Sequence, residues 1–196
     1  MTAQNMNSQN SATSTDQADR PMTIDDTAAA NDNVVTDISS DDHSASDNGV
    51  DLSAVFDPYF RPDANTIVCG ALNEEKVAAL AKAGVELVIN LQPEDELSFN
   101  ESAAVERAGM SYEHLPINGA EELKQLKILA FDNILRQYHG KKMAMHCGSG
   151  NRVGAAIALR AGWLRGRKMD TAMERGRSHG LTKLEQEVHN RLLVPR

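Results

Sequence analysis

Short apolar runs alternate along the chain with segments in which apolar residues recur at helical spacing. The apolar runs predict strands at residues 66–69, 85–91, 111–117 and 142–147. The helical spacing predicts a helix between Asn73 and Gly84 and further helices at residues 100–108, 121–139, 152–164 and 183–193. Strands that alternate with helices indicate an α/β fold, with a mostly parallel central sheet that helices flank on both faces.

Polar residues mark the first turns of two predicted helices. Asn73 can cap the helix that begins with Glu74 and Glu75, whose negative charges suit a helix N-terminus. Thr182 and Glu185 have the spacing of a capping box, which predicts a reciprocal cap on the last helix.

The acidity of the chain is concentrated in its first part. Residues 1–51 contain ten Asp, no Glu and one basic residue, Arg20, which gives a net charge of −9. Residues 52–196 contain 19 Lys and Arg against 18 Asp and Glu, so this part is nearly neutral. Because residues 1–50 hold few large apolar side chains, we expect a disordered acidic tail before a catalytic domain at 51–196. The tail has no amphipathic period, which favours a solubilising extension over a partner-binding segment.

Composition disfavours several classes of function. A nearly neutral folded part argues against a nucleic-acid surface. No apolar run reaches the roughly 18 residues of a membrane span and no basic and apolar leader is visible, so we expect a soluble, cytoplasmic protein. Cys69 and Cys147 are far apart, which suggests free thiols in a reducing compartment. Neither they nor the histidines have zinc spacing, so we predict no metal and no cofactor. The sequence indicates no oligomeric state.

Residues 142–154 contain the pattern with the most chemical content. An apolar run ends in His146 and Cys147, and a Gly-rich turn then leads to Arg152 and a helix. The backbone N–H groups of such a turn and the helix dipole favour a bound oxyanion. The same field favours the thiolate form of Cys147, which is the nucleophilic form. The planar guanidinium of Arg152 suits a tetrahedral oxyanion.

This order of His-Cys, Gly-containing loop, Arg and helix resembles the active-site loop of Cys-dependent tyrosine and dual-specificity phosphatases. More closely, residues 60–193 resemble the phosphatase-like domain of bacterial beta-lactamase hydrolase-like proteins. Besides the loop, the shared segments are residues 68–70, 83–85, 88–91 and 114–117. The resemblance implies a dual-specificity-phosphatase-like fold and a phosphorylated or other small oxyanion as substrate.

The resemblance also implies roles for individual residues. Cys147 would be the nucleophile, Arg152 would bind the oxyanion and His146 would tune the thiol. The backbone N–H donors around the oxyanion would come from Gly148, Ser149, Gly150 and Asn151.

Three departures from the phosphatase pattern affect the predicted reaction. Four residues separate Cys147 from Arg152 where phosphatases have five, and the shorter length resembles the loop of rhodanese-type sulfurtransferases. Val153 stands where phosphatases usually have Ser or Thr. No Asp occupies the segment expected to hold the general acid, where the nearest carboxylates are Glu121 and Glu122. A missing general acid costs about 10²–10⁴-fold in rate.

Three functions are compatible with these residues. As a phosphatase, the protein would form a cysteinyl-phosphate on Cys147. As a sulfurtransferase, it would carry a persulfide on Cys147, taken from a sulfane-sulfur donor such as thiosulfate. As an anion-binding module, it would hold phosphorylated ligands without turnover. The phosphatase-like hydrolase is the first hypothesis, because the chain after Arg152 is predicted to be helical and offers no closing strand of the rhodanese type.

Overall fold

The computed structural model describes residues 47–194 and contains a five-stranded sheet with the order β1-β2-β5-β3-β4. The strands are β1 (Tyr59–Asp63), β2 (Thr66–Cys69), β3 (Leu87–Asn90), β4 (Ser111–His114) and β5 (Met143–His146). The edge strand β1 pairs antiparallel with β2, and the other pairs are parallel. The prediction of a mostly parallel sheet is therefore confirmed, and β5 lies at its centre.

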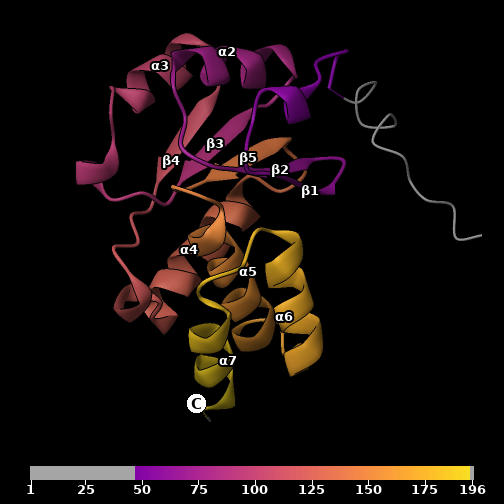
Figure 1. Cartoon of the computed structure of the whole chain (residues 1–196), viewed down its shortest axis with the longest axis vertical. Helices are drawn as coiled ribbons and strands as arrows, with labels where there is room; N and C mark the ends of the chain where they lie inside the picture. Colours follow the sequence, from indigo (N-terminus) through magenta and orange to yellow (C-terminus); the bar gives the residue numbers. More distant parts are fainter. Residues whose placement is uncertain (1–46, 195–196) are drawn as a thin grey trace, which may run out of the picture. The chain divides into compact units, whose positions relative to one another are not determined.

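Helices cover both faces of the sheet, as predicted (Figure 1). Helices α2 and α3 lie on one face, and α4, α5, α6 and α7 lie on the other. The α-helices are α2 (Glu74–Lys82), α3 (Glu101–Arg107), α4 (Gln125–Gln137), α5 (Asn151–Trp163), α6 (Met169–Ser178) and α7 (Glu185–Leu193). The 3-10 helices are η1 (Leu52–Ala54), η2 (Glu94–Glu96) and η3 (Ala120–Glu122). None of the helices within residues 47–194 combines the length and apolar character that crossing a membrane requires.

Asparagine side chains cap the two helices on the α2/α3 face. The Asn73 side chain accepts the Lys76 N–H at 2.8 Å, which confirms the predicted cap of α2. Asn100 does the same for α3, where it accepts the Ala103 N–H at 3.1 Å. Gly84 follows α2 with φ +81°, a left-handed conformation that ends a helix at low cost for glycine.

Strand β1 and helix α6 were missed because neither has a clear apolar period. Strand β1 carries Arg61 and Pro62 and lies at the sheet edge, where a proline is tolerated. Helix α6 buries a face of small residues and Met173. Its Gly176 lies so close to α5 that an added Cβ would be 2.8 Å from the Ala158 Cβ. Close approach of small residues, rather than large apolar ones, therefore holds α6 in place.

The predicted helix at residues 121–139 is interrupted. Helix η3 ends at Glu122 and α4 begins at Gln125, with Leu123 buried between them. The Glu122 carboxylate accepts the Asn118 N–H at 2.9 Å, and the Leu123 carbonyl accepts from the Arg191 side chain at 2.9 Å. These local hydrogen bonds satisfy the turn and divide the predicted helix in two.

The predicted strand at residues 111–117 is shorter than expected, because β4 ends at His114. The N–H groups of Leu115 and Ile117 still donate to carbonyls of the neighbouring strand segment, at 2.9 and 3.1 Å. Pro116 lies between them and has no N–H to donate, so the regular ladder stops.

The capping box predicted for α7 is wrong. The Thr182 hydroxyl donates to the Asn151 side chain at 3.3 Å instead of accepting from α7. The Glu185 carboxylate pairs with Arg177 at 3.1 Å, so it does not return to the Thr182 N–H. Both side chains that the box would use are thus engaged with other helices.

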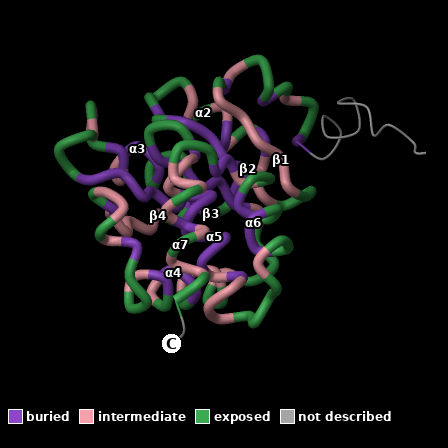
Figure 2. Tube along the Cα trace, turned by 60° about the horizontal axis from the view of Figure 1, so that its bottom comes forward, coloured by how far each residue is buried: buried purple, intermediate pink, exposed green. Residues whose placement is uncertain are grey.

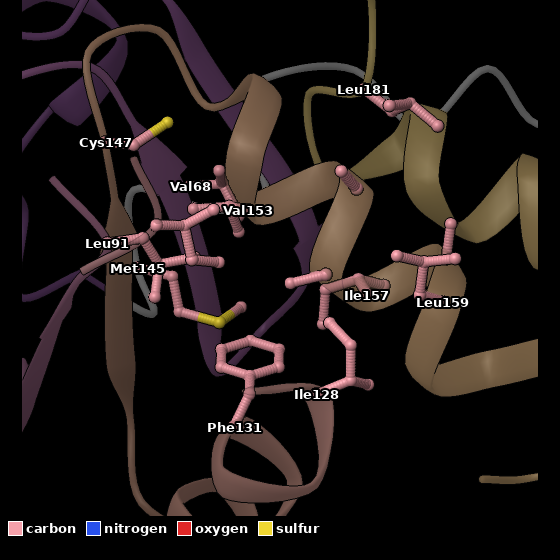
Figure 3. Packing of buried hydrophobic residues seen from close by; sticks show 14 of the residues in the cluster. Val68, Leu91, Ile128, Phe131, Met145, Cys147, Val153, Ile157, Leu159 and Leu181 are labelled. Carbon is pink, nitrogen blue, oxygen red and sulfur yellow. The ribbon is translucent and has the colours of Figure 1, made fainter. Parts of the chain in front are cut away.

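The sheet separates two apolar cores, and consecutive strand residues alternate between them. On β5, Met145 and Cys147 face the core under α4 and α5, whereas Ala144 faces the core under α2 and α3. Figure 2 shows the buried residues gathered in the strands and α5. In Figure 3, Cys147 lies at one end of the first core, beyond Leu91 and Met145.

Most of the predicted tail, residues 1–46, lies outside the described residues. Residues 47–50, which we also assigned to the tail, are placed against the domain. Asp47 is buried and forms ion pairs of 2.7 Å with Arg61 and Lys142. The described domain therefore begins before residue 51.

Candidate active site

The candidate nucleophile follows the central strand of the sheet. Cys147 comes directly after β5 and is 1% exposed. Its side chain belongs to the same core as Val153 of α5, while the preceding His146 faces the opposite side of the sheet. Ligands of open α/β sheets bind at the carboxyl ends of the strands, which is where Cys147 lies.

The loop after Cys147 is short and turns directly into α5. Gly150 has φ +79° at the N-cap of α5, and a Cβ there would lie 3.2 Å from the Phe60 ring. Ser149 forms an isolated bridge with Gly70, just after β2. Gly148 and Ser149 are exposed. The loop is thus fixed at one side by β2 and at the other by the helix N-terminus, and its outer surface is open.

Asn151 ties the loop to the segment between α6 and α7. Its side-chain oxygen accepts the N–H groups of Thr182 and Leu184 at 2.9 and 3.3 Å. The sequence predicted a backbone donor at this position. The side chain has an additional structural role that the sequence did not reveal, because its partners lie 31 and 33 residues away.

Arg152 is held by a carboxylate that the sequence did not single out. Its Nη2 donates to both carboxylate oxygens of Glu96, at 2.6 and 2.8 Å. Glu96 ends η2 after β3, and its Oε2 also accepts from Gln92 Nε2 at 3.4 Å. The same oxygen would lie 3.9 Å from a Cβ on Gly148, so the carboxylate borders the loop. The acidic run at residues 94–96, directly after a predicted strand, is the signal that could have found it.

One nitrogen of Arg152 is without a partner in the described part of the chain. Nη1 is buried and makes no hydrogen bond with any residue in 47–194. A buried donor of this kind costs about 1–3 kcal/mol when it is unsatisfied. Arg152 therefore has one terminal nitrogen bound to Glu96 and one whose hydrogen-bonding capacity no described residue uses.

A buried polar network lies on the opposite face of the sheet. His146 Nε2 and Glu101 Oε1 are 2.7 Å apart, and their side chains are 0% and 1% exposed. Nearby, the Asn90 side chain donates to the Tyr112 hydroxyl at 3.0 Å, and burial raises the pKa of Tyr112. His146 thus contacts α3 through Glu101, which fixes the residue immediately before Cys147.

The two predicted general acids lie around η3. The Asn118 N–H lowers the pKa of Glu122, and Lys127 lies 3.7 Å from its carboxylate. A carboxyl group held in its ionised form is a poor proton donor. Glu121 folds toward Gly119, where a Cβ would meet its carboxylate at 2.7 Å. Of the two carboxylates, Glu121 is therefore the better candidate for a proton donor, and this role stays a prediction.

Cys69 is separated from Cys147 by the sheet. Cys69 ends β2, pairs in register with His146 and faces the α2/α3 core. Burial raises the pKa of the Cys69 thiol, so this sulfur is a poor nucleophile at neutral pH. Both cysteines are free. Within residues 47–194, no group of three or more His, Cys, Asp or Glu side chains could hold a metal ion.

A Gly-rich loop at the carboxyl end of the central strand, with a cysteine before it and an arginine after it, defines a phosphatase-like α/β domain resembling tyrosine and dual-specificity phosphatases. Comparison with protein families identifies the particular group. Residues 62–162 match the family "Beta-lactamase hydrolase-like protein, phosphatase-like domain", and the chain belongs to this family. The predicted resemblance is thereby confirmed.

Solved structures share this fold at low sequence identity. A DUF442 protein from Shewanella putrefaciens CN-32 is 23% identical, with a TM-score of 0.53 over 68% of this chain and 89% of that one. Tk-PTP in its active form is 24% identical, with a TM-score of 0.52 over 68% and 95% of the two chains. TpbA from P. aeruginosa, solved in complex with pTyr, is 17% identical, with a TM-score of 0.54 over 69% and 82%. No curated protein has a sequence that matches this chain.

Proposed function

We propose that this domain is a cysteine-dependent phosphatase that hydrolyses phosphate monoesters through a phosphoryl intermediate on Cys147. The observation that carries the proposal is the buried Nη1 of Arg152, which has no hydrogen-bond partner in residues 47–194. Arg152 lies in the first turn of α5, five residues after Cys147. A bound phosphoryl oxygen would satisfy this donor and would also meet the positive end of the α5 dipole.

The reaction uses the groups around the loop in two steps. The Cys147 thiolate attacks phosphorus, an S–P bond forms, and the P–O bond to the leaving alcohol breaks while a carboxylic acid protonates that oxygen. Water then attacks the phosphorus, the S–P bond breaks and inorganic phosphate leaves. Arg152 and the N–H groups of the loop stabilise the equatorial oxygens, and Glu96 holds Arg152 in place.

The substrate class follows from the same site and from one relative. TpbA was solved with pTyr, which supports a phosphorylated substrate for this domain. The exposed Gly148 and Ser149 leave the outer side of the loop open, which suits a phosphate group presented on a larger molecule. We therefore propose an aryl or alkyl phosphate monoester as substrate.

A sulfurtransferase is the second candidate, and the residue after Arg152 favours it. The residue after Arg152 is Val153, which is fully buried in the core. Because valine has no hydroxyl, this position cannot stabilise a departing thiolate. A persulfide on Cys147 would need neither this hydroxyl nor a general acid. The shorter loop between Cys147 and Arg152 also suits this reaction.

A paired assay tests both candidates. Wild type and Cys147→Ser are mixed separately with p-nitrophenyl phosphate and with thiosulfate, and phosphate release and intact mass are measured. We expect phosphate release that requires Cys147 and no gain of a sulfur atom. A sulfur adduct on wild type without phosphate release would establish the sulfurtransferase instead. If neither phosphate release nor a sulfur adduct is observed, the enzymatic proposal is overturned and an anion-binding module is the function that is left.

Substitution of Arg152 tests the anion clamp. Arg152→Ala should lower kcat/KM by about 10²–10³-fold, the range seen when one oxyanion donor is removed. It should also weaken binding of inorganic phosphate in calorimetry. Arg136→Ala, an exposed arginine on α4 with a weak 3.9 Å ion pair, is the matched control. Equal phosphate affinity in the two variants would contradict the proposed role of Arg152.

A further inference from the structure

A cavity lies near the amino ends of β2 and β5. Its volume is about 470 Å³, and it is lined by Thr66 and Met143, the first residues of β2 and β5. Cys147 follows the last residue of β5, and Met145, two residues before it, is the lining residue nearest to it in the chain. Sites for small molecules commonly have volumes of about 300–1,000 Å³. This cavity is large enough for a ligand, and none of residues 146–152 lines it.

Basic side chains from two helices line this cavity. Arg160 of α5 donates through Nε to Asp132 at 2.7 Å, and its two terminal nitrogens make no hydrogen bond within residues 47–194. The guanidinium of Arg175 on α6 forms neither a hydrogen bond nor an ion pair with a described residue. Asp63 is the acidic residue of the lining. Asp132 thus already pairs with Arg160, and the cavity offers guanidinium donors that no described residue uses.

Two histidines add further polar groups. His179 is not readily protonated, because burial lowers its pKa. The positive charges of Arg175 and Arg160 lower this pKa further. Its Nδ1 lies 2.7 Å from the Arg175 carbonyl, which fixes Nδ1 as the protonated nitrogen of a neutral ring. His139, after α4, completes the polar lining. Both arginines are close enough to influence the charge of His179, so the basic groups converge on one region.

Apart from Thr66 and Ser178, the remaining lining is apolar. Leu135 of α4, Met145 of β5 and Ile157 of α5 contribute to the wall, and Met145 and Ile157 belong to the core that also contains Cys147. A ligand that fits this lining has an acidic group for the arginines and an apolar body for the wall. Inorganic ions alone would leave the apolar part of the cavity unused.

We propose that this cavity, between β5, α4, α5 and α6, is a binding site for a small organic anion, with a carboxylate or phosphate group bound by Arg160 and Arg175. The apolar body of the ligand contacts Met145 and Ile157. The site does not depend on the chemistry of Cys147, although β5 and α5 contribute residues to both regions.

The test uses the full chain and phenylphosphonate, whose C–P bond a phosphatase does not hydrolyse. A titration followed by ¹⁵N–¹H NMR reports on the two regions separately: amides of Gly140 and Ser178 for the cavity, and those of Gly148 and Ser149 for the loop. We expect saturable shifts in the cavity group, and the same shifts in Cys147→Ser. Saturation in the loop group alone would overturn the cavity proposal and leave the proposed function intact.

Charge variants make the assignment specific. Arg175→Gln should weaken binding in the cavity by about tenfold or more, because a charge-assisted contact is lost, and Arg175→Lys should restore part of it. Arg107→Gln removes one positive charge from α3, where the arginine is 72% exposed, and should leave binding unchanged. Because Arg175 is exposed on α6, its replacement should not affect folding. Equal affinity in Arg175→Gln and Arg107→Gln, or no saturable cavity shift at millimolar phenylphosphonate, would overturn the proposal.

Discussion

The two faces of the sheet provide different environments for two adjacent residues at the end of β5. His146 points to the α2/α3 face, where Glu101 holds it in a fully buried polar pair. Cys147 points to the α4–α7 face, into an apolar core that includes Val153. One face thus fixes the end of β5 through polar contacts, whereas the other places the thiol where the loop and α5 begin. The period of two along a strand is enough to separate these tasks.

The largest expected difference between the faces is in thiol reactivity. At neutral pH, iodoacetamide should modify Cys147 about 100-fold faster than Cys69, because burial raises the pKa of Cys69, whereas Cys147 lies beside the exposed loop that leads into α5. Mass spectrometry of peptides from the native protein gives the two rates. Cys69→Ser should be labelled at the wild-type rate, and Cys147→Ser should be almost inert. Comparable labelling of both thiols would show that the faces do not differ in this way.

Removal of the buried Glu101 carboxylate should lower the free energy of unfolding by disrupting the polar pair on the α2/α3 face. Glu101→Ala leaves the His146 imidazole buried without its hydrogen-bond partner, which should cost about 1–3 kcal/mol of unfolding free energy. Urea unfolding of both proteins measures the difference. Glu106→Ala on the same helix is the control, since this residue is exposed and its loss should change stability by no more than about 0.5 kcal/mol. Equal midpoints for the two variants would mean that the buried pair does not stabilise the fold.

The α4–α7 face should be sensitive to added volume instead. A Cβ on Gly154 of α5 would collide with the backbone nitrogen of Leu181, so Gly154→Ala should cost about 1–3 kcal/mol by overpacking. Gly162→Ala, on the same helix, meets the end of the flexible Leu192 side chain and should cost less. Thermal unfolding of the two variants gives the order. A Gly162→Ala variant less stable than Gly154→Ala would contradict this view of the packing between α5 and α6.

The sequence predicts features that lie within one continuous segment, and it misses contacts between residues that are far apart in the sequence. Strand β5, the loop after it and the order of Cys147 and Arg152 form one segment, so apolar runs and spacing were sufficient to find them. Glu96 and Glu101 were missed, because their partners Arg152 and His146 are 56 and 45 residues away. The failed cap at Thr182 has the same cause, since Asn151 competes for the hydroxyl from 31 residues away. Helix α6 escaped notice because small residues carry little hydrophobic signal.

The smallest expected effect concerns a charge cluster on the α4–α7 face. Burial would raise the pKa of Asp132, but the guanidiniums of Arg160 and Arg165, each 2.7 Å from its carboxylate, outweigh burial and lower it. A carboxyl with a lowered pKa in the folded protein stabilises the fold above its unfolded pKa of about 3.8, and this contribution is lost as the pH falls through the folded value. Because both arginines are partly exposed, Asp132→Asn should cost only about 1 kcal/mol at neutral pH.

The pH dependence identifies the charge as the cause. The stability difference between wild type and Asp132→Asn, measured by urea unfolding, should be constant near neutral pH and should shrink in acid below about pH 4. Asp170→Asn, an exposed residue at the start of α6, should show no such convergence. If the stability difference between wild type and Asp132→Asn stays the same in acid, the effect of Asp132 comes from packing and not from its charge.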